Sequence, residues 1–118
     1  MSKTRILVVE DSEVLLMAMQ DLLTAAGYAV ETACNGRQAL EVIQQASPQL
    51  VVTDIQMPSM DGIALCYALR TSDQWATIPL IFISGQESKN YCEPTGPIDF
   101  LPKPFAPEDL LALVTHYI

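Results

Sequence analysis

The sequence has few basic residues, and they are scattered. Six Lys and Arg residues stand against fourteen Asp and Glu, which gives a formal net charge of −8. The basic residues are spread from Lys3 to Lys103 without forming a cluster. Because an acidic surface repels a phosphate backbone, this composition argues against direct nucleic-acid binding.

Cysteine is also scarce. Cys34, Cys66 and Cys92 are odd in number and far apart, and no C-x-x-C pair is present. Neither a disulfide framework nor a zinc site is therefore predicted.

Long hydrophobic runs are missing as well. The longest apolar runs, at residues 6–9 and 80–83, have the length of a strand and are far too short to span a membrane. Residues 1–5 lead directly into the first run and do not read as a signal peptide. We expect a soluble, cytoplasmic protein, and 118 residues of which half are apolar suit one domain over residues 1–118.

The apolar residues that are present form short, β-rich runs. Residues 5–9, 50–53 and 80–83 are typical of central strands in a parallel sheet that is covered on both faces. Residues 29–33 and 98–101 are weaker runs and are predicted to be edge strands.

Helical patterns alternate with these strands. Apolar stripes at three-to-four spacing occupy residues 15–26, 39–46 and 63–70, and a last helix is predicted to start near Pro107. The alternation predicts an α/β fold with a doubly wound sheet and right-handed crossovers.

One crossover is missing from this pattern. Residues 85–97 contain two glycines and two prolines and have no apolar period, so an ordinary helix is not expected there. We predict that the fourth helix is short or replaced by a mobile loop over residues 86–97.

Polar side chains come directly after the predicted strands. The first strand ends in Glu10 and Asp11, the third in Asp54, the fourth in Ser84 and the fifth in Lys103. Ligands of open parallel sheets bind beyond the carboxyl ends of the strands, so these groups are expected to converge at one edge.

The chemistry of this set suits phosphoryl transfer. Two or three carboxylates repel one another unless a cation lies between them, and they form an oxygen site of the kind Mg²⁺ prefers. The metal and Lys103 would neutralise a transferring phosphoryl group, and Ser84 would donate to its oxygens. Asp54 is then the predicted nucleophile, which would form an aspartyl phosphate.

Four stretches in order resemble the receiver domain of bacterial two-component response regulators. They are residues 6–11 (ILVVED), 51–62 (VVTDIQMPSMDG), 79–84 (PLIFIS) and 99–105 (DFLPKPF). The resemblance implies a flavodoxin-like, five-stranded parallel sheet of strand order 2-1-3-4-5 with helices on both faces.

The resemblance also implies roles for single residues. Asp54 matches the phosphoacceptor, and Glu10 with Asp11 matches the acidic pair that binds Mg²⁺. Gln56 would contribute its backbone carbonyl to the metal. The remaining implied features are Ser84 as the hydroxyl that follows the phosphate, Lys103 as the lysine that contacts it, Phe100 as the switch aromatic and a cis Lys103–Pro104 bond.

The function implied is that of a phosphoacceptor in two-component signalling. A histidine kinase or a histidine phosphotransfer protein would donate the phosphoryl group, and phosphorylation would switch the binding of a downstream partner. The domain would catalyse only its own phosphorylation and dephosphorylation, so it is not expected to be an enzyme with a separate substrate.

Other functions remain open at this stage. A phosphatase for small molecules would share the aspartyl-phosphate chemistry, but it needs a second acid two residues after the nucleophile, where Gln56 stands. A flavodoxin-like cofactor binder would need a phosphate loop after the first strand. A pseudo-receiver would act only as an interaction module, and Phe100 could be an ordinary core residue.

Overall fold

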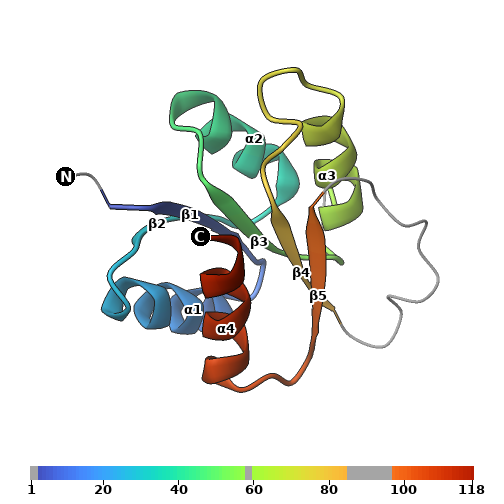
Figure 1. Ribbon diagram of the computed structural model, residues 1–118. Coiled ribbons are helices and arrows are strands. Elements are labelled where there is room, and N and C mark those ends of the chain that lie inside the picture. The colour runs from blue at the N-terminus through green and yellow to red at the C-terminus, as the bar shows by residue number, and fades with distance from the viewer. Residues whose placement is uncertain (1–2, 58–59, 85–96) are drawn as a thin grey trace.

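The computed structural model describes residues 3–57, 60–84 and 97–118, which build a parallel sheet between two layers of helices (Figure 1). In chain order the elements are β1 (Arg5–Val9), α1 (Glu13–Ala25), β2 (Ala29–Ala33), α2 (Gly36–Gln45), β3 (Leu50–Asp54), α3 (Gly62–Arg70), β4 (Leu80–Ser84), β5 (Ile98–Pro102) and α4 (Pro107–Tyr117). The strand order is β2-β1-β3-β4-β5 with every pairing parallel, which confirms the predicted sheet.

The prediction for residues 86–97 lies almost wholly outside the described residues, since only Pro97 belongs to them. It stays a prediction. The five predicted strands and the helices before and after this segment are confirmed close to their expected bounds.

The central strands are apolar along their whole length because both of their faces are covered. Residues 6–9 of β1 and 50–52 of β3 have no exposed surface. Successive side chains of a strand point to opposite faces, so Leu7 and Val9 face one layer of helices while Ile6 and Val8 face the other. A continuous apolar run is what a strand buried on both sides requires.

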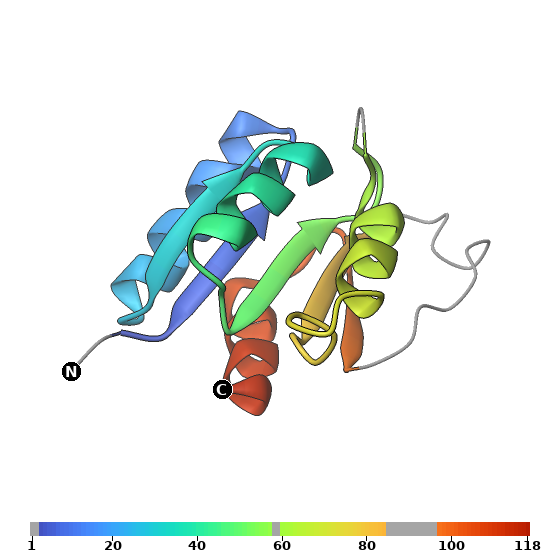
Figure 2. The same cartoon turned by 90° about the horizontal axis from the view of Figure 1, so that it is seen from above.

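Two helices cover each face of the sheet. Figure 1 shows α2 and α3 on one side and α1 and α4 on the other, and Figure 2 shows the same layers from above. Ala39, Ile43, Leu65 and Leu69 belong to the core of the first face. Met19, Leu23, Leu110 and Val114 belong to the core of the second.

Three helices begin with a side-chain cap just after a strand or loop at the same edge of the sheet. Ser12, Asn35 and Asp61 accept hydrogen bonds from backbone N–H groups in the first turns of α1, α2 and α3. Asp61 and Gly62 therefore form the start of α3. These caps fix where each helix enters the edge at which the acidic residues lie.

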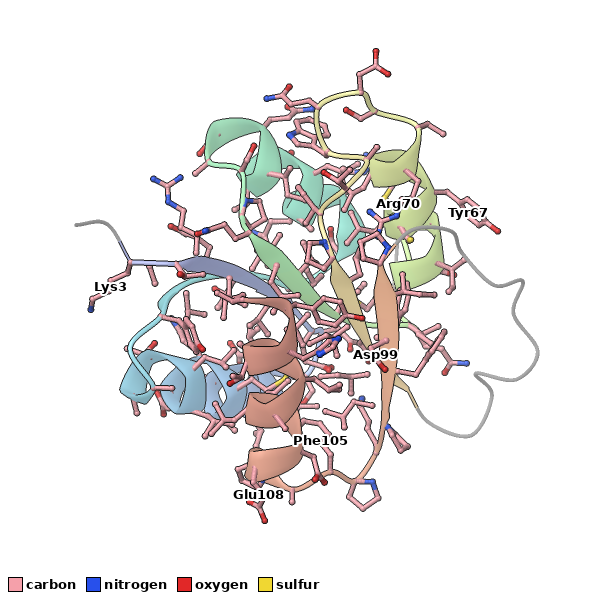
Figure 3. The ribbon with its side chains drawn as sticks, viewed as in Figure 1. Lys3, Tyr67, Arg70, Asp99, Phe105 and Glu108 are labelled. Atoms are coloured by element: carbon pink, nitrogen blue, oxygen red, sulfur yellow. The ribbon has the colours of Figure 1, made fainter. Side chains whose placement is uncertain are left out.

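The opposite edge of the sheet is held by Arg70, at the end of α3 (Figure 3). Its guanidinium donates to the carbonyl of Ile78 at 2.7 Å and to that of Pro97 at 3.1 Å. One side chain thus joins α3 to the segments that lead into β4 and β5. None of the helices in the described residues is long and apolar enough to cross a membrane.

Candidate phosphoacceptor site

Three carboxylates meet at the carboxyl ends of β1 and β3. Asp54 is the last residue of β3, and Glu10 and Asp11 directly follow β1. Val9 pairs with Thr53 in the parallel register, so the residue after each of them lies at the same level of the sheet. One ligand oxygen from each of the three acids lies within 4.8 Å of the others. The predicted acidic cluster is therefore present in the folded chain.

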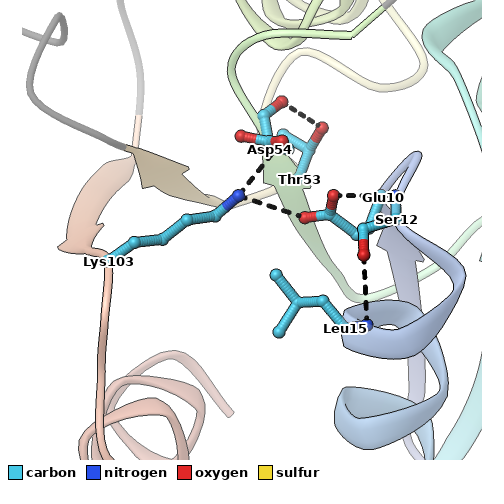
Figure 4. A network of polar contacts seen from close by, with 6 residues as sticks. All are labelled: Glu10, Ser12, Leu15, Thr53, Asp54 and Lys103. Carbon is cyan, nitrogen blue, oxygen red and sulfur yellow. Dashed lines mark hydrogen bonds and ion pairs between the residues drawn. The ribbon is translucent and has the colours of Figure 1, made fainter.

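Lys103 reaches this cluster from the segment after β5. Its Nζ atom lies 3.3 Å from Oδ2 of Asp54 and 3.6 Å from Oε1 of Glu10 (Figure 4). The Lys103–Pro104 peptide bond is cis, as the resemblance implied. A single ammonium is thus shared by two carboxylates from different strands.

The three acids differ in exposure. Glu10 is 1% exposed and Asp54 is 7% exposed, whereas Asp11 is open to solvent. The pKa of Glu10 is raised to about 7, chiefly by burial; the nearby Asp54 and Asp11 contribute to the rise, and a hydrogen bond from Ser12 and the attraction of Lys103 oppose it. Among the described residues, the site therefore holds more negative charge than the ammonium of Lys103 neutralises at pH values above neutrality.

The donor set and one buried oxygen without a hydrogen bond fit a divalent cation. Oε1 of Glu10 is buried and, among the described residues, lacks a hydrogen-bond partner. Asp11 lies on the exposed side of the same cluster, where water could complete a coordination shell. Carboxylate oxygens with free positions for water are the donors that Mg²⁺ prefers, so the residues fit this ion.

Two supporting residues were not predicted from the sequence. The backbone N–H of Ser12 donates to Oε2 of Glu10 at 3.1 Å, and the hydroxyl of Thr53 donates to the carbonyl of Asp54 at 2.9 Å. Ser12 also caps α1, and a serine just before an apolar helical stripe was a usable signal. Thr53 carried no such signal, because a threonine in a buried strand is ordinary.

Two other predicted residues are only partly placed. Ser84 ends β4 and pairs with Pro102, but its side chain lies outside the described part of the structure. Gln56 lies two residues after Asp54 with an exposed side chain. Their roles toward phosphate and metal stay predictions.

Phe100 lies on β5 opposite Phe82 of β4. The two residues are paired in the sheet register, and their rings stack with centroids 5.3 Å apart and an interplanar angle of 27°. Phe82 is fully buried, whereas Phe100 is 38% exposed. The predicted switch aromatic is therefore in contact with the core and open to solvent at the same time. Phe82 was not singled out in the sequence.

An apolar pocket opens beside the acidic cluster. It has a volume of about 560 Å³ and lies between α1 and the segment that joins β5 to α4. Leu15 and Leu22 line it on one side, and Lys103 and Phe105 line it on the other. Val14 and Met17, also on α1, are 82% and 61% exposed. Apolar surface of this kind on a folded chain is typical of a protein contact.

The fold and the site together define a phosphoacceptor-type domain of the doubly wound class, with its acids and lysine at the carboxyl edge of the sheet. Comparison with known proteins gives the family. The family described as "Response regulator receiver domain" matches residues 6–115. The chain therefore belongs to the response regulator receiver domains of two-component signalling.

Individual relatives agree with this assignment. Response regulator MprA from Mycolicibacterium vanbaalenii is 38% identical over 111 residues, which are 92% of this chain and 47% of the relative. The chain thus spans about half the length of the curated relatives it matches.

Solved structures give the same result. Chemotaxis protein CheY4 of Vibrio cholerae superposes with a TM-score of 0.90 at 32% identity, covering 99% of this chain and all of that one (100%). The receiver domain of a histidine kinase from Syntrophus aciditrophicus has a TM-score of 0.89 at 30% identity, covering 97% and 89% of the two chains.

Proposed function

We propose that Asp54 accepts a phosphoryl group from a phosphohistidine of a histidine kinase or a histidine phosphotransfer protein, in a reaction that requires Mg²⁺. The observation that carries the proposal is the meeting of Asp54 with Lys103 at 3.3 Å and with the oxygens of Glu10 and Asp11. In this reaction the chain modifies itself and turns over no metabolite.

The step is a displacement at phosphorus. A carboxylate oxygen of Asp54 attacks the phosphorus atom, a new P–O bond forms, and the P–N bond of the donor breaks with its electron pair returning to the imidazole. Lys103 holds an oxygen of the transferring group, and it leaves its ion pair with Asp54 to do so. Ser84 is positioned by β4 at the same edge and is proposed to donate to another phosphoryl oxygen.

Glu10, Asp11 and Asp54, with the backbone carbonyl of Gln56, would hold the metal ion. When bound, Mg²⁺ supplies positive charge against the oxygens of the transferring group and the two acids beside it. The buried Oε1 of Glu10 supports this assignment, since a metal or a metal-bound water would satisfy an atom that has no hydrogen bond among the described residues.

The phosphodonor is proposed to dock on α1 beside the pocket. Val14 and Met17 present exposed apolar side chains on α1, the helix whose Leu15 and Leu22 line the pocket, so a protein that contacts α1 would bring its phosphohistidine close to Asp54. The net charge of −8 argues against nucleic acid as a direct ligand. We place the domain, residues 1–118, in the cytoplasm.

The experiment compares wild-type protein with Asp54→Asn. Both are incubated with acetyl phosphate and Mg²⁺, and the acid-labile phosphoryl label is counted on the protein. Wild-type protein should be labelled and Asp54→Asn should not, because the amide cannot form the aspartyl phosphate. Full labelling of Asp54→Asn would overturn the assignment.

A matched control is Asp73→Asn. Asp73 is exposed and lies after α3, at the edge of the sheet away from the acidic cluster. This variant should be labelled like wild-type protein. A label that disappears when Mg²⁺ is replaced by EDTA would support the metal requirement, and an unchanged label would contradict it.

A further inference from the structure

Two backbone hydrogen bonds connect the loop after β2 to the peptide that follows Asp54. The N–H of Gly36 donates to the carbonyl of Met60 at 3.0 Å. Two residues further along, the N–H of Gly62 donates to the carbonyl of Ile55 at 2.8 Å. The start of α2 is therefore linked, through the start of α3, to the end of β3.

Both glycines sit where a side chain has no room. A Cβ atom added at Gly36 would lie 2.6 Å from the carbonyl oxygen of Met60 and 2.7 Å from its Cγ. A Cβ atom added at Gly62 would overlap the carbonyl oxygen of Asp54. Neither glycine has the positive φ that Gly27 has. Close approach of two backbones, and not a special backbone conformation, thus requires glycine at these positions.

The loop that carries Gly36 is itself fixed. Asn35 accepts a hydrogen bond from the backbone N–H of Gln38 at 2.8 Å, and the side chain of Gln38 accepts one from the N–H of Cys34 at 2.7 Å. These reciprocal bonds hold the entry to α2 on both sides of Gly36. A change at Gly36 would therefore move Met60 more readily than it would move this loop.

We propose that Gly36 is a positioning residue for the acidic site, an inference that rests on the proposed function. Gly36 supports Met60, and Met60 sets the place of Gly62, which lies directly against the backbone of Asp54 and Ile55. A side chain at position 36 pushes Met60 and Gly62 outward and releases the backbone of Asp54 from its present position.

A substitution at Gly36 is expected to weaken metal binding. The oxygens of Asp54, Glu10 and Asp11 lie within 4.8 Å of one another only while the end of β3 is held in place. Mg²⁺ tolerates little deviation from octahedral geometry, so a small shift of Asp54 weakens binding. The peptide between Ile55 and Gln56, which carries the bond from Gly62, shifts with it.

The test is a calorimetric Mg²⁺ titration of the full chain. Gly36→Ala should bind Mg²⁺ about tenfold more weakly than wild-type protein, as is usual when a residue that supports a metal ligand is lost. Phosphorylation by acetyl phosphate is then measured against Mg²⁺ concentration. The half-saturating concentration should rise by the same factor, while the rate at saturating Mg²⁺ stays within about twofold of wild type.

Two control variants separate positioning from stability and packing. Gly27 has a φ of 101° and no atom within 4 Å of an added Cβ, and it lies after α1 at the other edge of the sheet. Gly27→Ala should lower thermal stability through backbone strain and leave Mg²⁺ binding unchanged. Met60→Ala keeps the carbonyl that Gly36 contacts and should also bind Mg²⁺ like wild-type protein.

The outcomes are distinct. Wild-type affinity in folded Gly36→Ala, or an equal loss in Gly27→Ala, would overturn the inference. If Gly36→Ala does not fold, the double variant Gly36→Ala with Met60→Ala removes the overlap with Cγ of residue 60 and keeps the overlaps with its carbonyl oxygen and Cβ. A loss of Mg²⁺ affinity in this double variant supports the inference, and wild-type affinity overturns it. Wild-type protein that binds no Mg²⁺ would overturn the proposed function itself.

Discussion

Lys103 Nζ lies 3.3 Å from Oδ2 of Asp54, so an ion pair occupies the position to which a phosphoryl group is proposed to be transferred. The two residues are 49 positions apart in the sequence and come from the ends of β3 and β5. The same ammonium lies 3.6 Å from Glu10. Among the described residues, Lys103 is therefore the cation that holds the acidic cluster together when no metal is bound.

Replacing Lys103 with methionine should destabilise the metal-free protein. The variant leaves Glu10 and Asp54 buried without a cation, and since the Lys103 side chain is 33% exposed, we expect a loss of about 1–2 kcal/mol. Urea unfolding with EDTA measures it, and added Mg²⁺ should recover part of the loss. Lys3→Met, at an exposed position, is the control; equal midpoints for the two variants would contradict the prediction.

The stability of the metal-free protein should fall as pH rises from 5 to 8. Burial raises the pKa of Glu10 from 4.5 to about 7, so the folded state binds this proton more tightly than the unfolded state does. The stabilisation of the folded state by this proton is complete below pH 4.5 and is lost as the pH rises through 7. Its size is on the order of 3 kcal/mol.

Glu10→Gln isolates this contribution, because the amide stays neutral at every pH. Its unfolding free energy, measured in urea with EDTA at pH 5 and pH 8, should fall less than that of wild-type protein. Glu13→Gln, at an exposed position on α1, should behave like the wild type. The same pH dependence in all three proteins would rule out a role for Glu10.

Magnesium binding should release a proton near neutral pH. Glu10 must be ionised to act as a ligand, and its pKa of about 7 means that much of it is protonated in the metal-free protein at pH 6.5. Calorimetric titrations at pH 6.5 in two buffers of different ionisation enthalpy give the number of protons released. A value near zero in wild-type protein would contradict this prediction, and Glu10→Gln provides the zero reference.

Phosphorylation should change the environment of the stacked rings of Phe82 and Phe100. If Phe100 acts as the switch aromatic, beryllofluoride with Mg²⁺ should move the NMR signals of both rings, because the rings are 5.3 Å apart. Asp54→Asn should show no such change. Shifts confined to the neighbourhood of Asp54, with both rings unmoved, would make Phe100 an ordinary residue of the sheet.

Met17→Asp should separate protein donors from small ones. Met17 is 61% exposed on α1, so a charge there costs the fold little but opposes an apolar contact with a donor protein. Phosphotransfer from a phosphorylated kinase or phosphotransfer protein should slow about tenfold or more, as for an interface hot spot. Labelling by acetyl phosphate should stay at the wild-type rate; a parallel loss in both reactions would place the effect at Asp54 instead of at docking.

Much of the fold was predictable because strands covered on both faces leave a clear pattern. The apolar runs that became β1, β3 and β4 have no polar alternation, and the helices between them show apolar stripes. The Asp61–Gly62 pair suits a turn as well as a helix start, because a helix cap and a turn use the same residue types. The pair starts a helix because residues 63–69 pack against the sheet. This packing cannot be inferred from the two residues alone.

The sequence by itself determined which chemical groups lie at the carboxyl ends of the strands, because in a parallel sheet the residue after each apolar run must lie at one edge. That placed Glu10, Asp11, Asp54 and Lys103 in one site. Only the tertiary structure decided that Lys103 is shared between two acids and that Glu10 is almost fully buried. It also decided the contact of Gly36 with Met60. These relationships depend on distances between segments far apart in the chain, and no local pattern of residue types records such distances.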